Sequence, residues 1–85
     1  MGYDVEVSGR AERDLAGLPS AVGSRIAKAI YRLAENPRQA LDLKKLKGRE
    51  GYRLRVGSYR VLVHIDNRRR VVLVVQVGHR RGIYR

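Results

Sequence analysis

The sequence predicts a single α+β domain over residues 1–85: an N-terminal strand, an antiparallel two-helix hairpin, then a three-strand antiparallel meander, with the helices packed on one sheet face. Two patterns predict this class. Apolar residues recur every three or four positions through most of the first half, and they alternate with polar residues in the second half. With 85 residues and no cysteine, the chain can build one small core without disulfides.

The first half carries signals for one strand and two helices. Residues 3–7 alternate apolar and polar side chains, as an exposed strand does. Ser8 is suited to cap a short helix that Pro19 interrupts, and Ser20 can cap a second helix that Pro37 stops. A short turn joins the two helices, so we expect them to lie antiparallel.

The second half predicts a connector and three strands. Residues 38–51 are rich in lysine and glycine and are expected to form the connector. A two-residue hairpin signal, Gly57-Ser58, separates the first two strands. The expected strands are Tyr52–Val56, Tyr59–Asp66 and Arg70–Val77.

Strand alternation assigns the side chains of this meander to two faces. One parity is apolar and is expected to face the helices. In the last strand it comprises Val71, Leu73, Val75 and Val77. The opposite parity gathers Arg53, Arg55, Arg60, Gln76 and Arg80, and no acidic residue is expected on that face.

The charge is unevenly distributed along the chain. The formal net charge is +11, and residues 1–43 contribute none of it because their six acidic and six basic side chains cancel. Arginines outnumber lysines by fifteen to four, and the guanidinium group binds phosphate oxygens in a bidentate manner. A neutral half joined to a basic half favours a face that binds a polyanion over a chain that is merely kept soluble by its charge.

Several kinds of chemistry find no support in the sequence. The two histidines have no cysteine or acid at ligand spacing, and the basic half has no paired carboxylates, so we expect no metal and no cofactor. No segment is apolar enough to cross a membrane, and the N-terminus does not resemble a signal peptide, so we expect a cytoplasmic protein that does not associate with membranes.

RNA cleavage is compatible with this inventory, because RNA carries its own nucleophile, the 2′-hydroxyl group. The reaction needs a base near that hydroxyl, cations around the phosphorane and an acid at the leaving oxygen. Arginine stabilises the phosphorane but is a poor general base. The candidates for proton transfer are therefore Lys45, Lys47, His64, His79 and Tyr84.

Four segments, read together, resemble the RelE branch of the RelE/ParE toxin superfamily. They are LKG at residues 46–48, GYRLRVGSYRV at 51–61, VGHRR at 77–81 and IYR at 83–85. The upstream strand and helix pair fit the same pattern, so the resemblance covers essentially the whole chain. It implies a RelE-like fold and a toxin of a type II toxin–antitoxin system that enters the ribosomal A site and cleaves mRNA by metal-independent 2′-hydroxyl attack.

The resemblance also implies roles for particular residues. Arg60 is similar to the arginine that stabilises the phosphate, Arg80 to the residue near the leaving oxygen, and Tyr84 to the tyrosine that stacks on or orients the base. Arg53 and Arg55 occupy positions where the best-studied branch carries lysines, one of them proposed as the general base. This departure strengthens the positive charge of the site and weakens the case for a base at either position.

Further residues are expected to bind RNA, and the resemblance implies partners. Lys45 and Lys47 are candidates for substrate contact, and His79 and Arg81 extend the basic surface towards the C-terminus. The implied partners are mRNA, the ribosome with 16S rRNA at its A site, and a cognate acidic antitoxin in a hetero-oligomer. Two alternatives stay open: a ParE-like toxin that acts on DNA gyrase, and a non-catalytic RNA-binding module.

Overall fold

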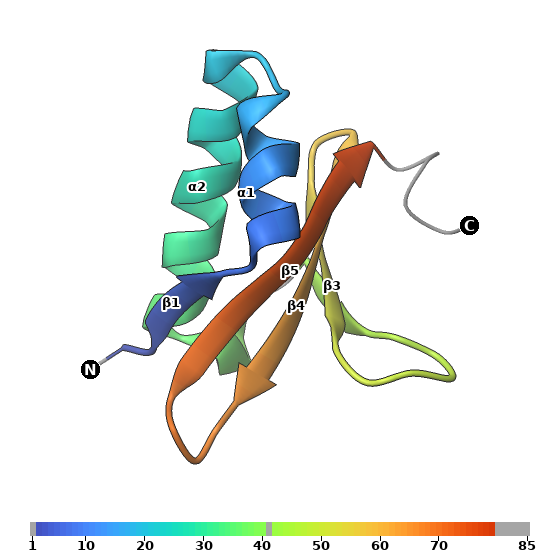
Figure 1. The fold of residues 1–85 in the computed structure, drawn as a ribbon. Helices are drawn as coiled ribbons and strands as arrows, with labels where there is room; N and C mark the ends of the chain where they lie inside the picture. Colours follow the sequence, from blue (N-terminus) through green and yellow to red (C-terminus); the bar gives the residue numbers. More distant parts are fainter. Residues whose placement is uncertain (1, 41, 80–85) are drawn as a thin grey trace.

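The computed structural model describes residues 2–40 and 42–79 of the chain. Two helices cover one face of a five-stranded sheet, and the other face is left open (Figure 1). The strand order is β1-β5-β4-β3-β2, with β1 parallel to β5 and every other neighbouring pair antiparallel. The elements are β1 (Asp4–Val7), α1 (Gly9–Ala16), α2 (Ser20–Glu35), the 3₁₀ turn η1 (Pro37–Gln39), β2 (Leu43–Lys45), β3 (Tyr52–Val56), β4 (Tyr59–Asp66) and β5 (Val71–His79).

The predicted α+β architecture is confirmed, with two additions in the connector. Residues 38–51 were expected to be irregular, but they contain the end of η1 and the edge strand β2. A strand of three residues is too short to show alternation, so its sequence carries no periodic signal. Ser20 is the first residue of α2 rather than its cap, because Pro19 occupies the N-cap position without a side-chain hydrogen bond.

The core lies between α2 and the central strands. Ile26 and Ile30 project from α2 onto Val61 of β4 and Val74 of β5, and Ala11 of α1 is fully buried beside them. Burying each of the larger aliphatic side chains contributes about 1.5–3 kcal/mol. This layer supports the strands whose other face is open. No helix within the described residues is long and apolar enough to span a bilayer.

A β-bulge in β5 changes which of its valines face the core. Leu62 pairs with Gln76 whereas Val63 pairs with Val74, so Val75 is the extra residue. The prediction that Val71, Leu73, Val75 and Val77 face the helices is therefore wrong for the first three. The extra residue of the bulge shifts the alternation by one position, so only Val77 is on the predicted side. The residues of β5 in the core cluster are Val72, Val74 and Val77.

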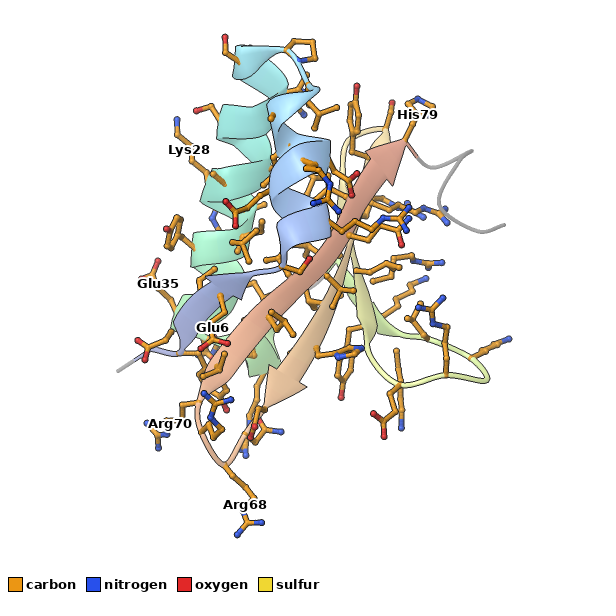
Figure 2. The ribbon with its side chains drawn as sticks, viewed as in Figure 1. Glu6, Lys28, Glu35, Arg68, Arg70 and His79 are labelled. Carbon is orange, nitrogen blue, oxygen red and sulfur yellow. The ribbon has the colours of Figure 1, made fainter. Side chains whose placement is uncertain are left out.

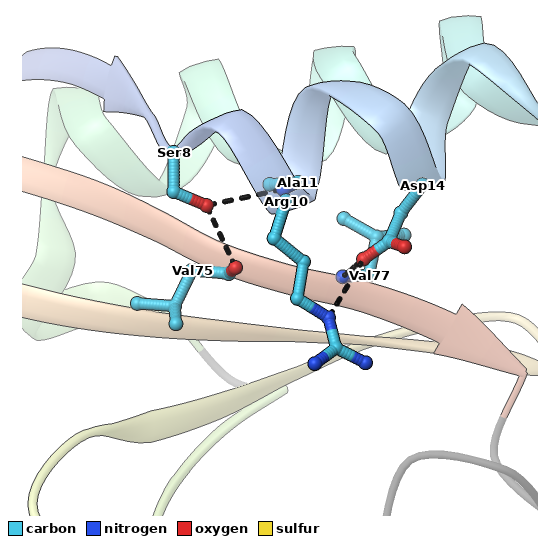
Figure 3. A network of polar contacts seen from close by, with 6 residues as sticks. All are labelled: Ser8, Arg10, Ala11, Asp14, Val75 and Val77. Carbon is cyan, nitrogen blue, oxygen red and sulfur yellow. Dashed lines mark hydrogen bonds and ion pairs between the residues drawn. The ribbon is translucent and has the colours of Figure 1, made fainter.

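Helix α1 satisfies the backbone of β5 at this bulge, where β1 has already ended (Figure 3). The Ser8 hydroxyl donates to the carbonyl of Val75 at 2.8 Å, and the Val77 N–H donates to the Asp14 carboxylate at 3.0 Å. Ser8 also caps α1 as predicted, because its Oγ accepts the N–H of Ala11. Past Val74, the edge of β5 that faced β1 is thus bound by a helix, while its other edge remains paired with β4.

Candidate nucleic-acid interface

The open face of the sheet carries a cluster of arginines on β3 and β4. The register sets Arg55 directly opposite Arg60, and Arg53 opposite Leu62. Lys44 of β2 lies opposite Arg53 and extends the cluster to the edge of the sheet. Like charges on directly opposed positions repel, so this arrangement costs stability unless an anion neutralises it.

A pocket of about 550 Å³ lies beside this cluster, between the loop after β2 and the open face. We call it the basic pocket. Five of its lining residues are cations, two are leucines, and none is acidic. The lining residues are Lys44, Lys45, Leu46, Lys47, Arg49, Arg53 and Leu62.

The wall of the basic pocket is held in place by contacts of Gly51. The Leu46 N–H donates to the carbonyl of Gly51 at 3.0 Å and closes the loop. Gly51 has φ 109°, and a Cβ atom there would lie 2.7 Å from Cδ2 of His64. Only glycine allows this backbone conformation and this approach to β4.

The expectation that the open face carries no acid is wrong. Asp66 and Asp4 flank Val71 across the sheet, and Glu6 lies beside Leu73, all on the parity of Arg60. Local alternation gives the N-terminal strand no position in the sheet, and Asp66 is the last residue of its own strand. By the rise of a strand, the row of Asp66 and Asp4 lies about 20 Å from Arg60 along β4, and the row of Glu6, level with His64, lies about 13 Å from it.

The acidic end has its own partners. Asp66 accepts the backbone N–H groups of Arg68 and Arg69 at 3.0 Å each, which shapes the β4–β5 turn. Glu6 lies 3.6 Å from the guanidinium of Arg69. Arg68 extends outward from this turn, at the opposite end of the hairpin from His79 (Figure 2). The open face therefore has a basic half around Arg53 and Arg60, and a half of mixed charge in which the acids lie beside Arg68 and Arg69.

The structure brings together part of the predicted site. Arg53 and Arg60 share the open face and are half-buried, and Lys45 and Lys47 line the basic pocket. Arg80, Arg81 and Tyr84 lie outside the described residues.

Two predicted residues have surroundings that the sequence did not indicate. His79 pairs with Tyr59 on the helix-facing parity, and their rings meet edge to face with centroids 5.5 Å apart. Arg55 lines a second cavity of about 440 Å³ below α2, where its backbone N–H donates to the carbonyl of Asp42 at 3.0 Å. His79 therefore lies at the margin of the cluster, whereas Arg55 borders both this cavity and the cluster, where it is opposite Arg60.

Sequence reasoning missed four residues of the basic pocket: Lys44, Leu46, Arg49 and Leu62. The run of lysines at 44–47 was a signal for the first of them. The sequence carries no signal for Leu62. A leucine on the polar parity of a strand could equally be exposed, and only the position of the loop shows that it lines a pocket. Within the described ranges, no group of three or more histidine and carboxylate side chains could hold a metal ion.

Comparison with known proteins assigns this open basic sheet face, backed by two helices, to a class: the small toxins of toxin–antitoxin systems. Residues 5–84 match the family described as the ParE toxin of the type II toxin–antitoxin system parDE. The chain belongs to the RelE/ParE superfamily of type II toxins.

Two toxins of the RelE type are similar to this chain over almost their full length. The chain is 32% identical to the putative toxin RelE1 of Methanocaldococcus jannaschii, covering 100% of this chain and 98% of that protein. It is also 32% identical to toxin RelG of Mycobacterium tuberculosis, covering 100% and 99% of the two chains.

Solved structures support the same relationship. The toxin–antitoxin complex RelBE2 of M. tuberculosis contains a chain with a TM-score of 0.83 and 29% identity, covering 94% of this chain and 93% of that one. The archaeal RelE–RelB complex of Pyrococcus horikoshii gives a TM-score of 0.80 at 28% identity, with coverages of 98% and 99%. This protein is therefore a RelE-like toxin in fold and sequence.

Proposed function

We propose that this toxin is a ribosome-dependent endoribonuclease that cleaves mRNA in the A site and stops translation. The observation that carries the proposal is the opposition of Arg55 and Arg60 on the open face, next to Arg53 and a pocket without acidic residues. Clustered arginines bind an RNA backbone through its phosphates. The RelE names of its full-length relatives point in the same direction.

The proposed reaction uses the 2′-hydroxyl of the substrate. Its oxygen bonds to the adjacent phosphorus as a base takes the proton, and the bond from phosphorus to the 5′-oxygen breaks as that oxygen is protonated. The products are a 2′,3′-cyclic phosphate and a 5′-hydroxyl. Arg53, Arg55 and Arg60 would stabilise the negative charge that develops on the phosphorane, together with Arg80 at the leaving oxygen and Tyr84 on the base.

Proton transfer from the 2′-hydroxyl falls to a group other than arginine. Lys45 and Lys47 line the basic pocket next to Arg53, and His64 is exposed on the same face beside Gly51. His79 is less suited, because its ring packs against Tyr59 on the other parity of the sheet. The ribosome would supply the remaining acceleration by fixing the geometry of the mRNA.

The proposed partner that restrains this activity is an acidic antitoxin. The similar toxins from M. tuberculosis and P. horikoshii are found in complexes with RelB proteins. The basic half of the open face would attract an acidic segment, and covering that half would exclude RNA from the same side chains. The proposed target, the translating ribosome, lies in the cytoplasm.

A map of 5′ ends on a reporter mRNA tests the proposal. Purified toxin should produce cuts within codons only when translating ribosomes are present. Arg60→Ala and Arg80→Ala should abolish the cuts, whereas Arg68→Ala removes the same charge from the far end of the hairpin and should leave them. If the protein still arrests growth but leaves the mRNA intact, the proposed nuclease activity is refuted.

A second candidate is a toxin that acts on DNA gyrase. It is favoured by the ParE description of the matching family and by the arginines at positions 53 and 55, where the resemblance leads one to expect lysines. A supercoiling assay with purified gyrase distinguishes the two. Gyrase inhibition together with uncut mRNA would support this candidate, and normal supercoiling with cut mRNA would eliminate it. A protein that binds ribosomes and inhibits neither process would be the RNA-binding module.

A further inference from the structure

Two cavities within the described residues differ in charge. The cavity below α2 is lined by acids and bases together, including Glu35 and Asp42 alongside Arg32 and Arg55. The basic pocket has five cations and no acid in its lining. Of these two cavities, the basic pocket is therefore the one whose lining is strongly positive, and its ligand should be an anion.

The floor of the basic pocket is apolar. Leu62 is only 3% exposed, yet it lies on the open-face parity and outside the main core cluster. Groups on the open face, and not the helices, therefore cover it. Leu46 adds a second apolar side chain to the same lining. An apolar floor does not stabilise a bound phosphate group. It favours a nucleobase, because the apolar face of the base is removed from water when the base binds there.

The pocket is preorganised. The hydrogen bond from Leu46 to Gly51 and the close approach of Gly51 to His64 fix the loop against β4. A fixed wall lowers the entropy that is lost when a ligand binds. Its volume of about 550 Å³ also falls within the range of small-ligand sites.

The position of the pocket relates it to the proposed cleavage site. Arg53 belongs to both, because it lines the pocket and lies on the same face as Arg60. Leu62 is two residues from Arg60 on β4, about 7 Å along the strand. A nucleotide in the pocket and a phosphate at Arg60 would therefore be neighbours on one RNA strand.

We propose that the basic pocket is a nucleotide subsite: Leu46 and Leu62 contact the base, and Lys44, Arg49 and Arg53 bind the phosphate of the nucleotide next to the one cleaved. This inference rests on the proposed nuclease function for its biological role. The binding itself can be measured without ribosomes, so the two proposals can fail separately.

The test is a titration of the isotope-labelled full-length toxin with adenosine 5′-monophosphate, followed by backbone amide shifts. We expect shifts at residues 44–51 and at Leu62, with an affinity about tenfold higher than that of inorganic phosphate, since contact with the base adds free energy. Leu46→Ala should reduce the affinity for the nucleotide towards that for phosphate and leave phosphate binding unchanged.

Charge variants complete the test. The double variant Lys44→Ala/Arg49→Ala should weaken nucleotide binding about tenfold or more, because it removes two phosphate contacts. Arg68 lies outside the pocket, so the variant Arg68→Ala should bind the nucleotide with the affinity of the unchanged protein. Equal affinities for nucleotide and phosphate, or shifts spread equally over residues 68–70, would show an anion-binding surface without a base site and would overturn the proposal.

A competition experiment separates RNA from a protein ligand. A glutamate-rich peptide that displaces the nucleotide from the pocket, and binds it more tightly than a short oligoribonucleotide does, would assign the pocket to an acidic partner and overturn the subsite. If nucleotide binds the pocket as expected but mRNA stays intact on ribosomes, the subsite stands and the nuclease function fails. If mRNA is cut and the double variant cuts it with unchanged KM, the subsite alone fails.

Discussion

Gly51 is the residue on which the wall of the basic pocket depends. Its φ of 109° lies where side chains are rarely tolerated, and its missing Cβ leaves room for His64 and for the carbonyl of Val63. His64 lies on the same face of the sheet as Arg60. A single residue without a side chain thus links the loop, the pocket and one of the candidates for proton transfer.

Gly51→Ala tests this dependence. We expect the free energy of unfolding to fall by about 1–3 kcal/mol, since the substitution adds backbone strain and a Cβ contact of 2.7 Å. Urea denaturation measures the change. Gly23→Ala is the matched control: nothing lies within 4 Å of its Cβ position in α2, so it should stabilise the protein by about 0.5–1 kcal/mol. Equal stability of the two variants would contradict this account.

At the scale of elements, α1 supports the end of β5 that leads to the proposed site. The bulge at Val75 leaves backbone groups that β1 is too short to reach, and Ser8 and Asp14 bind them instead. Because unsatisfied backbone groups are costly in a partly buried position, these two side chains fix where β5 runs past Val77. The helix therefore affects the open face without contributing a side chain to it.

Asp14→Ala should lower the free energy of unfolding by about 1–3 kcal/mol, because the Val77 N–H loses its acceptor. Hydrogen exchange at Val77 should become faster than at Val61, which lies in the middle of the sheet. Asp14→Asn keeps an oxygen acceptor and should restore most of the protection. Glu12→Ala, an exposed change on the same helix, serves as the control. Slow exchange at Val77 in Asp14→Ala would show that this hydrogen bond is dispensable.

At the scale of the whole molecule, the acids of the open face are separated from its cluster of arginines. Along β4, Asp4 and Asp66 lie about 20 Å and Glu6 about 13 Å from Arg60, which exceeds the distance of roughly 8–10 Å over which charges act at physiological salt. The basic half therefore attracts an anion almost independently of these acids. This separation lets a chain with several acids still present a strongly positive surface.

RNA binding through the basic half should weaken steeply as salt rises. For a single-stranded octanucleotide, each neutralised phosphate contributes about −0.7 to the slope of log K against log salt. Arg60→Ala should reduce the magnitude of that slope by about this amount. Arg68→Ala removes the same charge from the other end and should leave the slope unchanged. Fluorescence anisotropy at several salt concentrations provides the measurement, and salt-independent binding would exclude this face as the RNA surface.

The sequence by itself determined the two helices, the limits of β3 and β4, and the concentration of charge in the second half. These features are encoded by local periodicity and by turn residues such as Pro19 and Gly57. The candidate arginines Arg53 and Arg60 also followed from alternation along single strands. Each of these signals is contained within a few residues of sequence.

Only the tertiary structure decided the pairing of β1 with β5, the edge strand β2, the bulge at Val75 and the basic pocket floored by Leu62. These features depend on contacts between residues far apart in the chain. Both parities of β5 are rich in valine, so its local pattern fits either register, and packing against the two helices selects one. The separation of acids from arginines arises in the same way, because strand order sets which charges become neighbours.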